Sequence, residues 1–188
     1  AFTTITTVIG PALGGLLAVL LVGSVTDPLH ATLAGLLAGA VLGAAQWFAL
    51  RPAGTSPAWI AATAGAMAAG SVGSAAITGA ATTTAALVTG GLVSGAVVGL
   101  AQALVVRSGP IMLIVWTALV GASWALAWFV TANVIVDAVR GYVVFGSSGA
   151  LLATIITGLA VRRLVAPADA GVRPITEAGP LPTGSEGM

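Results

Sequence analysis

Charge is the scarcest property of this sequence. Its 188 residues include six arginines, five acidic residues and one histidine but no lysine, and no charged residue occurs between Arg51 and Arg107 or between Arg107 and Asp137. A water-soluble domain carries about 25% charged residues because water must solvate its surface, whereas this chain carries 6% and has a mean hydropathy of +1.11. Only helices surrounded by lipid tolerate that deficit. The composition therefore predicts an all-α, polytopic membrane protein.

Cysteine is absent altogether, and histidine occurs once, at His30. The first absence excludes disulfides, thiolate metal sites and a cysteine nucleophile, and a single histidine cannot form a metal site. The apolar segments have no mid-membrane ionisable residues, and the motifs of metalloproteases, serine hydrolases and P-loop nucleotidases are missing. A net charge of +1 is too small to indicate nucleic-acid binding. We therefore expect a protein that is not an enzyme and carries no metal or cofactor.

Glycine, by contrast, is abundant and follows a repeated pattern. Residues 35–51 and 91–107 align at an offset of 56, with nine of 17 positions identical. The identities include two scarce residue types, pairing Gln46 with Gln102 and Arg51 with Arg107. Each copy has glycines at four-residue spacing, which fall on one helix face and let another helix approach closely. The predicted helix-packing glycines are Gly35, Gly39, Gly43, Gly91, Gly95 and Gly99.

Apolar runs of about 20 residues, the length that crosses a bilayer core, predict six transmembrane helices. Some of these spans are preceded by a helix N-cap residue followed by proline, such as Ser56-Pro57. The predicted spans are residues 3–22, 28–50, 58–78, 85–106, 111–131 and 143–165. They form one domain, residues 1–165, made of three hairpins at about 1–56, 57–110 and 111–165, and the period near 55 predicts a pseudo-threefold bundle. Residues 166–188, rich in proline and glycine, are expected to form an extended cytoplasmic tail.

The arginines indicate how the chain is oriented in the membrane. Those that end the second, fourth and sixth predicted spans all lie on one side, at Arg51, Arg107, Arg162 and Arg163. An excess of arginine marks the cytoplasmic side, so both termini are expected there, with these arginines as interface anchors. The alanine, glycine and arginine usage without lysine fits a bacterial source, and the predicted location is the bacterial cytoplasmic (inner) membrane.

The two equivalent glutamines are the candidate polar site. Gln46 and Gln102 each lie five residues before an arginine, about 7–8 Å inside that boundary by helical rise. One interpretation is a polar pair that lines a site near the cytoplasmic mouth. The other, which is commoner in membrane bundles, is interhelical hydrogen bonding that fixes how the hairpins pack, at about 0.6 kcal/mol per bond.

The tryptophans allow a similar choice. Trp47, Trp59 and Trp116 lie near the predicted cytoplasmic interface, where indole rings are favoured, so we interpret them as interface anchors. Trp124 lies deeper and one helical turn from Trp128. These two rings either contact a lipid, a pigment or a partner helix, or fill the core.

The first copy of the repeat carries a family resemblance. Residues 39–51 place glycines at four-residue spacing before Gln46, Trp47, aliphatic residues and Arg51. This pattern resembles repeats in small, uncharacterised bacterial multi-pass membrane proteins, over about residues 35–130. The second copy departs at Ala103, where the pattern has tryptophan. The resemblance implies a membrane fold of repeated hairpins, and it implies no activity, substrate or catalytic residue.

Three functions remain compatible with these residues. The first is a non-catalytic accessory subunit that packs against a larger membrane complex. The expected partners are the lipid bilayer and either other membrane protein subunits or further copies of this chain. The second is a small channel for a neutral solute, which predicts that Gln46 and Gln102 face a shared cavity. The third is a binder of a quinone, carotenoid or lipid, which predicts that Trp124 and Trp128 face a groove open to lipid. We favour the accessory subunit.

Overall fold

The computed structural model describes residues 20–21, 28–134 and 156–157, and its regular structure within these ranges is helical. The long helices are α2 (Pro28–Leu50), α3 (Ala58–Thr78), α4 (Thr84–Val105) and α5 (Pro110–Val134), and a 3-10 helix, η1 (Arg51–Ala53), follows α2. These four helices are long and apolar enough to cross a membrane. The predicted class of apolar, membrane-spanning helices is therefore confirmed for this part of the chain.

The remaining predicted elements lie almost wholly outside the described residues. The spans predicted at 3–22 and 143–165 are represented only by residues 20–21 and 156–157, which are helical, and the predicted tail at 166–188 is not represented. Within the described part, the prediction of 58–78 matches α3 at both ends. Helix α5 continues to Val134, three residues beyond its predicted end.

Local capping explains where the helices begin and end. The Thr83 hydroxyl accepts a hydrogen bond from the Ala86 N–H at 3.2 Å, which starts α4, and Pro110 is the first residue of α5. Proline is favoured at that position because it lacks the N–H that a helix start leaves unused. Helix α3 ends at Gly79, which takes a left-handed φ of 62°. Glycine takes that conformation without a steric penalty.

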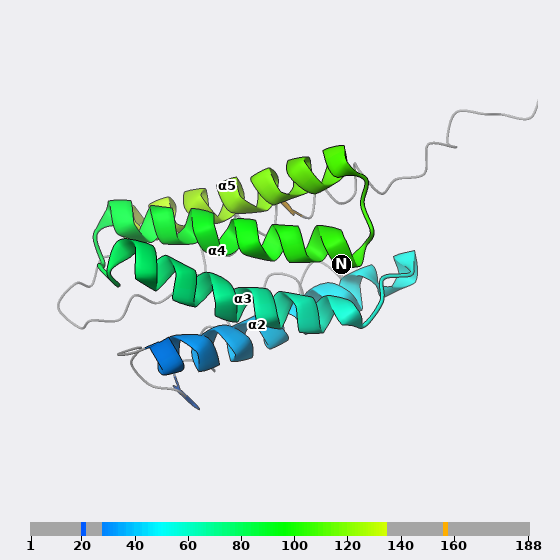
Figure 1. Ribbon diagram of the computed structural model, residues 1–188, viewed down its shortest axis with the longest axis horizontal. Helices are drawn as coiled ribbons and strands as arrows, with labels where there is room; N and C mark the ends of the chain where they lie inside the picture. The colour runs from blue at the N-terminus through cyan, green and yellow to red at the C-terminus, as the bar shows by residue number, and fades with distance from the viewer. Residues whose placement is uncertain (1–19, 22–27, 135–155, 158–188) are drawn as a thin grey trace, which may run out of the picture.

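The four helices form an antiparallel row in which each packs against its neighbour in the sequence (Figure 1). Helix α3 lies between α2 and α4, and α4 lies between α3 and α5. Within the described residues, helices that are not consecutive make no backbone-level contact. Because α2 and α4 run in the same direction, their C-terminal ends lie at the same end of the row, where α3 and α5 begin.

The predicted packing glycines of α2 lie against α3. A Cβ built on Gly39 would lie 2.7 Å from the Ala64 Cα, and one built on Gly35 would lie 2.8 Å from the Ala68 Cα. Real side chains do not tolerate such distances, so only glycine permits this separation of the two backbones. Gly43 continues the same contact near Ile60.

The packing glycines of α4 lie in the same way against α5. A Cβ built on Gly95 would lie 2.9 Å from the Val120 carbonyl oxygen, and one built on Gly99 would lie 3.0 Å from the Thr117 Cα. Gly91 lies against the Trp124 backbone. Both glycine stripes are therefore covered by the next helix of this chain.

The partners of the two stripes correspond residue by residue at a separation of 57. The third glycines of the stripes, in α2 and α4 respectively, contact Ile60 in α3 and Thr117 in α5. The second glycines contact Met67 and Trp124 in the same order. Ser71 and Trp128 take the equivalent places at the first glycine. The contact pattern therefore pairs α2 with α3 and α4 with α5. The predicted hairpins instead divide the chain between the helices of each pair, at residues 56 and 110.

Candidate functional site

Gln102 is the centre of a polar cluster inside the bundle. Its side chain is 2% exposed. The amide nitrogen donates to the Gln46 Oε1 at 3.0 Å and to the Thr63 Oγ1 at 3.2 Å. The amide oxygen accepts from the Trp116 Nε1 at 3.3 Å. Both N–H groups and the oxygen are thus engaged, which is the usual condition for burying an amide in an apolar interior.

Gln46 closes the cluster on the other side. Its Oε1 accepts from the Trp59 Nε1 at 3.0 Å as well as from Gln102. An indole N–H can only donate, so the two tryptophans determine which end of each amide carries the oxygen. Gln46 is half-buried, and its amide nitrogen makes no hydrogen bond within the described part of the chain.

The two glutamines use their tryptophans in the same way. Each accepts from an indole on the next helix, 13 residues further on for Gln46 and 14 residues further on for Gln102. The glutamines themselves are bonded across 56 positions, the offset of the sequence repeat. Four consecutive helices therefore meet in one hydrogen-bonded group. We call this group the Gln–Trp cluster: Gln46, Trp59, Thr63, Gln102 and Trp116.

Burial corrects the interpretation of two tryptophans. Interface anchors would be exposed to lipid headgroups, but Trp59 is 4% exposed and Trp116 is 8% exposed. Their rings join the hydrophobic core with Val98, Ala103 and other residues, and their N–H groups point to the glutamines. An indole suits either environment because it combines a large apolar ring with one donor; here the buried amide oxygens provide the acceptors.

Trp47 and Arg51 lie at the end of α2, as the anchor interpretation expects, and both have local partners. The Trp47 Nε1 donates to the Thr55 carbonyl at 3.0 Å and so ties the helix to the following turn. The Trp47 ring meets the Phe48 ring edge-on, with centroids 5.2 Å apart. The Arg51 guanidinium lies 5.0 Å from the Phe48 centroid, within the range of a cation–π contact.

Arg107 occupies the equivalent turn after α4. Its side chain is exposed, and its backbone takes a left-handed φ of 54°, which is uncommon for a residue with a Cβ. No interaction of its guanidinium is found among the described residues. The other two predicted anchors, Arg162 and Arg163, lie outside those residues.

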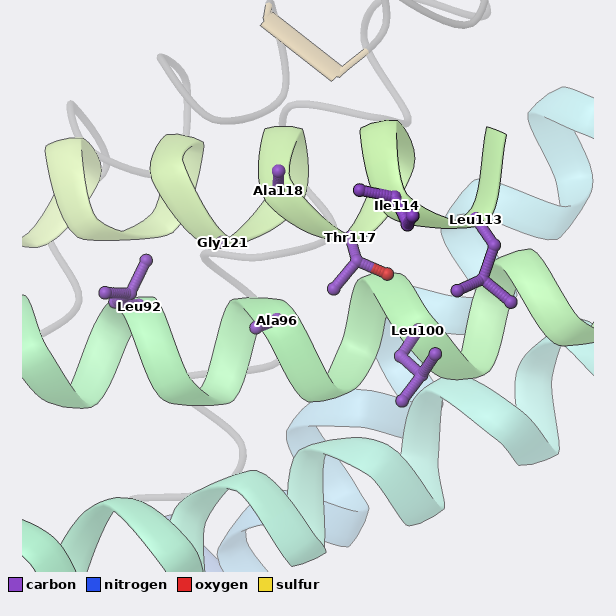
Figure 2. Close-up of a pocket in the computed structure, with 8 residues that line it drawn as sticks. All are labelled: Leu92, Ala96, Leu100, Leu113, Ile114, Thr117, Ala118 and Gly121. Carbon is purple, nitrogen blue, oxygen red and sulfur yellow. The ribbon is translucent and has the colours of Figure 1, made fainter. Parts of the chain in front are cut away.

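Trp124 and Trp128 pack against the glycine stripe of α4. A Cβ built on Gly95 would lie 2.8 Å from the Trp124 Cβ, and one on Gly91 would meet the Trp128 ring. Both rings are half-buried. A separate groove between α4 and α5 is lined by other residues (Figure 2): Leu92, Ala96, Leu100, Leu113, Ile114, Thr117, Ala118 and Gly121.

The chemistry available to the Gln–Trp cluster is limited to hydrogen bonding. It contains amides, a hydroxyl and indoles, none of which transfers a proton near neutral pH. No group of three or more histidine, cysteine, aspartate or glutamate side chains that could hold a metal occurs among the described residues. The arrangement fixes helices relative to one another, which is the packing interpretation of Gln46 and Gln102.

Sequence reasoning identified the glutamines but missed their partners. Thr63 is 0% exposed and belongs to the cluster, yet nothing in its local sequence separates it from the other hydroxyl residues. For the tryptophans, the sequence does contain a pattern that predicts the contact. A tryptophan follows the glutamine by 13 residues in one copy of the repeat and by 14 residues in the other. Helices of about 20 residues joined by short turns bring such positions to the same height.

Comparison with models of protein families, with curated proteins and with solved structures gives no match to this chain. No relative therefore supplies an activity, a ligand or a partner. The function is inferred from the chain's own residues: a buried hydrogen-bonded cluster that joins four apolar helices.

Proposed function

We propose that this protein is a non-catalytic accessory subunit of the bacterial cytoplasmic membrane, which packs against a larger membrane protein complex. The observation that carries this proposal is the Gln–Trp cluster. The two glutamines of the described spans hydrogen-bond to each other and to neighbouring hydroxyl and indole groups in the interior rather than lining an open path. A bundle built in this way supports its neighbours structurally.

The outer surface supports the same role. Large apolar side chains are exposed along all four helices, including Leu29 at 65%, Ile77 at 64%, Leu104 at 58% and Ile111 at 78%. No charged residue interrupts the chain between Arg51 and Arg107. Lipid and apolar protein surfaces both suit such an exterior.

The channel hypothesis receives less support from the cluster. It predicts that Gln46 and Gln102 face a shared cavity, but the two amides are 3.0 Å apart and bonded directly. A solute would have to replace the bonds that Gln102 makes to three other side chains. Replacing such bonds leaves buried donors without partners, which costs about 1–3 kcal/mol for each group.

We also propose that the whole chain extends this pattern to six spans, with both termini on the cytoplasmic side. The correspondence between the α2–α3 and α4–α5 contacts supports a repeated two-helix unit. Arg51 and Arg107 follow α2 and α4 at the same end of the row, which supports one arginine-rich side. Cysteine scanning with a membrane-impermeant reagent tests this topology, because residues 54 and 109 should be labelled only from the cytoplasmic side.

Mass spectrometry of the particle extracted gently from its native membrane tests the accessory role. We expect other membrane proteins in fixed stoichiometry with this chain, and an unrelated multi-pass protein carrying the same tag is the control. Recovery of the chain alone, or only as a homo-oligomer, contradicts the proposal.

Liposome flux distinguishes the accessory role from the channel. We expect the purified protein to pass glycerol and urea no faster than protein-free vesicles do. Flux above that background that disappears in the Gln46→Leu/Gln102→Leu double variant would replace the accessory role with the channel.

A further inference from the structure

The groove between α4 and α5 is apolar, narrow and open to the exterior (Figure 2). Its volume is about 300 Å³. Three of its lining residues are exposed on the outside, with Leu92 at 48%, Leu100 at 40% and Ile114 at 66%. Gly121 lies close to the backbone of α4, because a Cβ built there would lie 3.3 Å from the Leu92 carbonyl oxygen.

The dimensions of the groove fit one hydrocarbon chain. Its α5 wall runs from Leu113 to Gly121, about 12 Å by helical rise, which is less than the roughly 15 Å of one leaflet of the hydrocarbon core. A volume of about 300 Å³ over that length gives a cross-section of roughly 25 Å². A helix about 10 Å in diameter needs roughly 80 Å². An acyl chain can therefore lie along the groove, whereas a partner helix can only cover its mouth.

A cation lies at one end of the groove. Arg107 follows α4, and its backbone N–H donates to the Leu104 carbonyl at 3.1 Å, one helical turn beyond Leu100 of the lining. On the α5 side, the Leu113 N–H donates to the Gly109 carbonyl at 2.9 Å. Only a few residues of the chain therefore separate Arg107 from both walls. No side chain within the described ranges pairs with it.

The equivalent seam between α2 and α3 differs in both respects. Gly121 and Thr117 of the groove correspond, at a separation of 57, to Ala64 and Ile60, whose side chains are larger. Arg51, the counterpart of Arg107, already lies over the Phe48 ring. Arg107 therefore combines a neighbouring apolar groove with a guanidinium that has no partner among the described residues, whereas Arg51 already has one.

We propose that the α4–α5 groove binds an anionic phospholipid, with one acyl chain along the groove and the headgroup phosphate paired with Arg107. The groove supplies apolar contact along a single leaflet, and the guanidinium supplies bidentate recognition of phosphate. This inference goes beyond the accessory role and does not depend on which proteins, if any, accompany the chain.

Native mass spectrometry of the purified full chain tests the headgroup contact. The protein is incubated in mild detergent with equimolar phosphatidylglycerol and phosphatidylcholine that carry the same acyl chains. We expect phosphatidylglycerol to be retained preferentially, and Arg107→Gln to lower the ratio of retained lipids about fivefold, which corresponds to about 1 kcal/mol for one arginine near an anionic headgroup. The matched variant Arg51→Gln should leave the ratio unchanged. Equal retention of both lipids, or equal effects of the two arginine variants, overturns the proposal.

A second variant tests the acyl-chain contact. Ala118 is an exposed residue that lines the groove, so Ala118→Phe should fill it and reduce retention of both lipids without moving the helices. Ala122→Phe places the same ring at an exposed position of α5 outside the groove and is the control. Undiminished lipid retention by Ala118→Phe refutes the proposal. If that variant instead removes a protein partner from the extracted particle while lipid retention persists, the groove is a protein-docking surface and the proposal is wrong.

Discussion

Gln102→Leu should destabilise the folded bundle by about 3–5 kcal/mol, because it removes three hydrogen bonds from a buried site and leaves a buried donor without a partner. The substitution keeps a similar volume and lengthens no side chain, so packing changes little. The bonds lost are those to Gln46 and Thr63 and the one accepted from Trp116.

The magnitude follows from the environment of each group. Three interhelical bonds at about 0.6 kcal/mol each contribute roughly 2 kcal/mol. The Trp116 Nε1 then remains without an acceptor in a ring that is 8% exposed, and an unpartnered buried donor costs about 1–3 kcal/mol. Gln46 retains its bond from Trp59, so its oxygen adds little to the loss.

Reversible unfolding in mixed micelles of mild detergent and SDS, followed by tryptophan fluorescence, measures this loss. Asn133→Leu is the matched control, because the Asn133 amide is exposed and bonds only the Phe129 carbonyl of its own helix at 2.7 Å. A double-mutant cycle with Gln46→Leu should give a coupling energy of at least about 0.5 kcal/mol. Additive effects, or a Gln102→Leu loss no larger than that of Asn133→Leu, would show that the cluster does not hold the helices together.

Two further predictions use the same unfolding measurement. Gly39→Ala should cost about 1–3 kcal/mol, because its Cβ would lie 2.7 Å from the backbone of α3; Gly65→Ala, which has nothing within 4 Å, should be neutral or stabilising by up to about 1 kcal/mol. Equal effects of these two alanines would contradict the close-packed seam. Thr117→Val should raise stability by about 1 kcal/mol, because it removes a buried hydroxyl that has no hydrogen-bond partner, and a loss of stability would mean that this hydroxyl is satisfied in the membrane.

Periodicity and capping predicted much of the described fold. Apolar runs bounded by proline and glycine located α2 and α3 to the residue and α4 and α5 to within about three residues, because both signals are local. Gly39 and Gly95, which were predicted as helix-packing residues, lie against the backbone of the next helix. Their partner helices were not predictable, since a small-residue stripe serves a neighbour in the same chain and one in another chain equally well.

The site was predicted only in part, for a related reason. Gln46 and Gln102 were identified because glutamine is scarce in the sequence and recurs at the repeat offset. A direct hydrogen bond between them depends on how three helices are positioned along the bundle axis, which the sequence does not give. Trp59 and Trp116 were assigned to the interface because the sequence gives their distance from a turn but not the direction of the ring. The groove is lined by Gly121 and by residues of both α4 and α5, so it depends on how these helices pack, which the sequence alone does not give.

The hydrogen bond between Gln46 and Gln102 also has a consequence for the order of membrane insertion. Nearly all other packing in the row joins consecutive helices, so it can form as each pair emerges. When α2 and α3 have inserted, Gln46 can already accept from Trp59, whereas Thr63 still lacks the donor that α4 brings. The bond across 56 residues therefore forms only after α4 has inserted, and it ties the first helix of the row to the third once both have reached the correct depth.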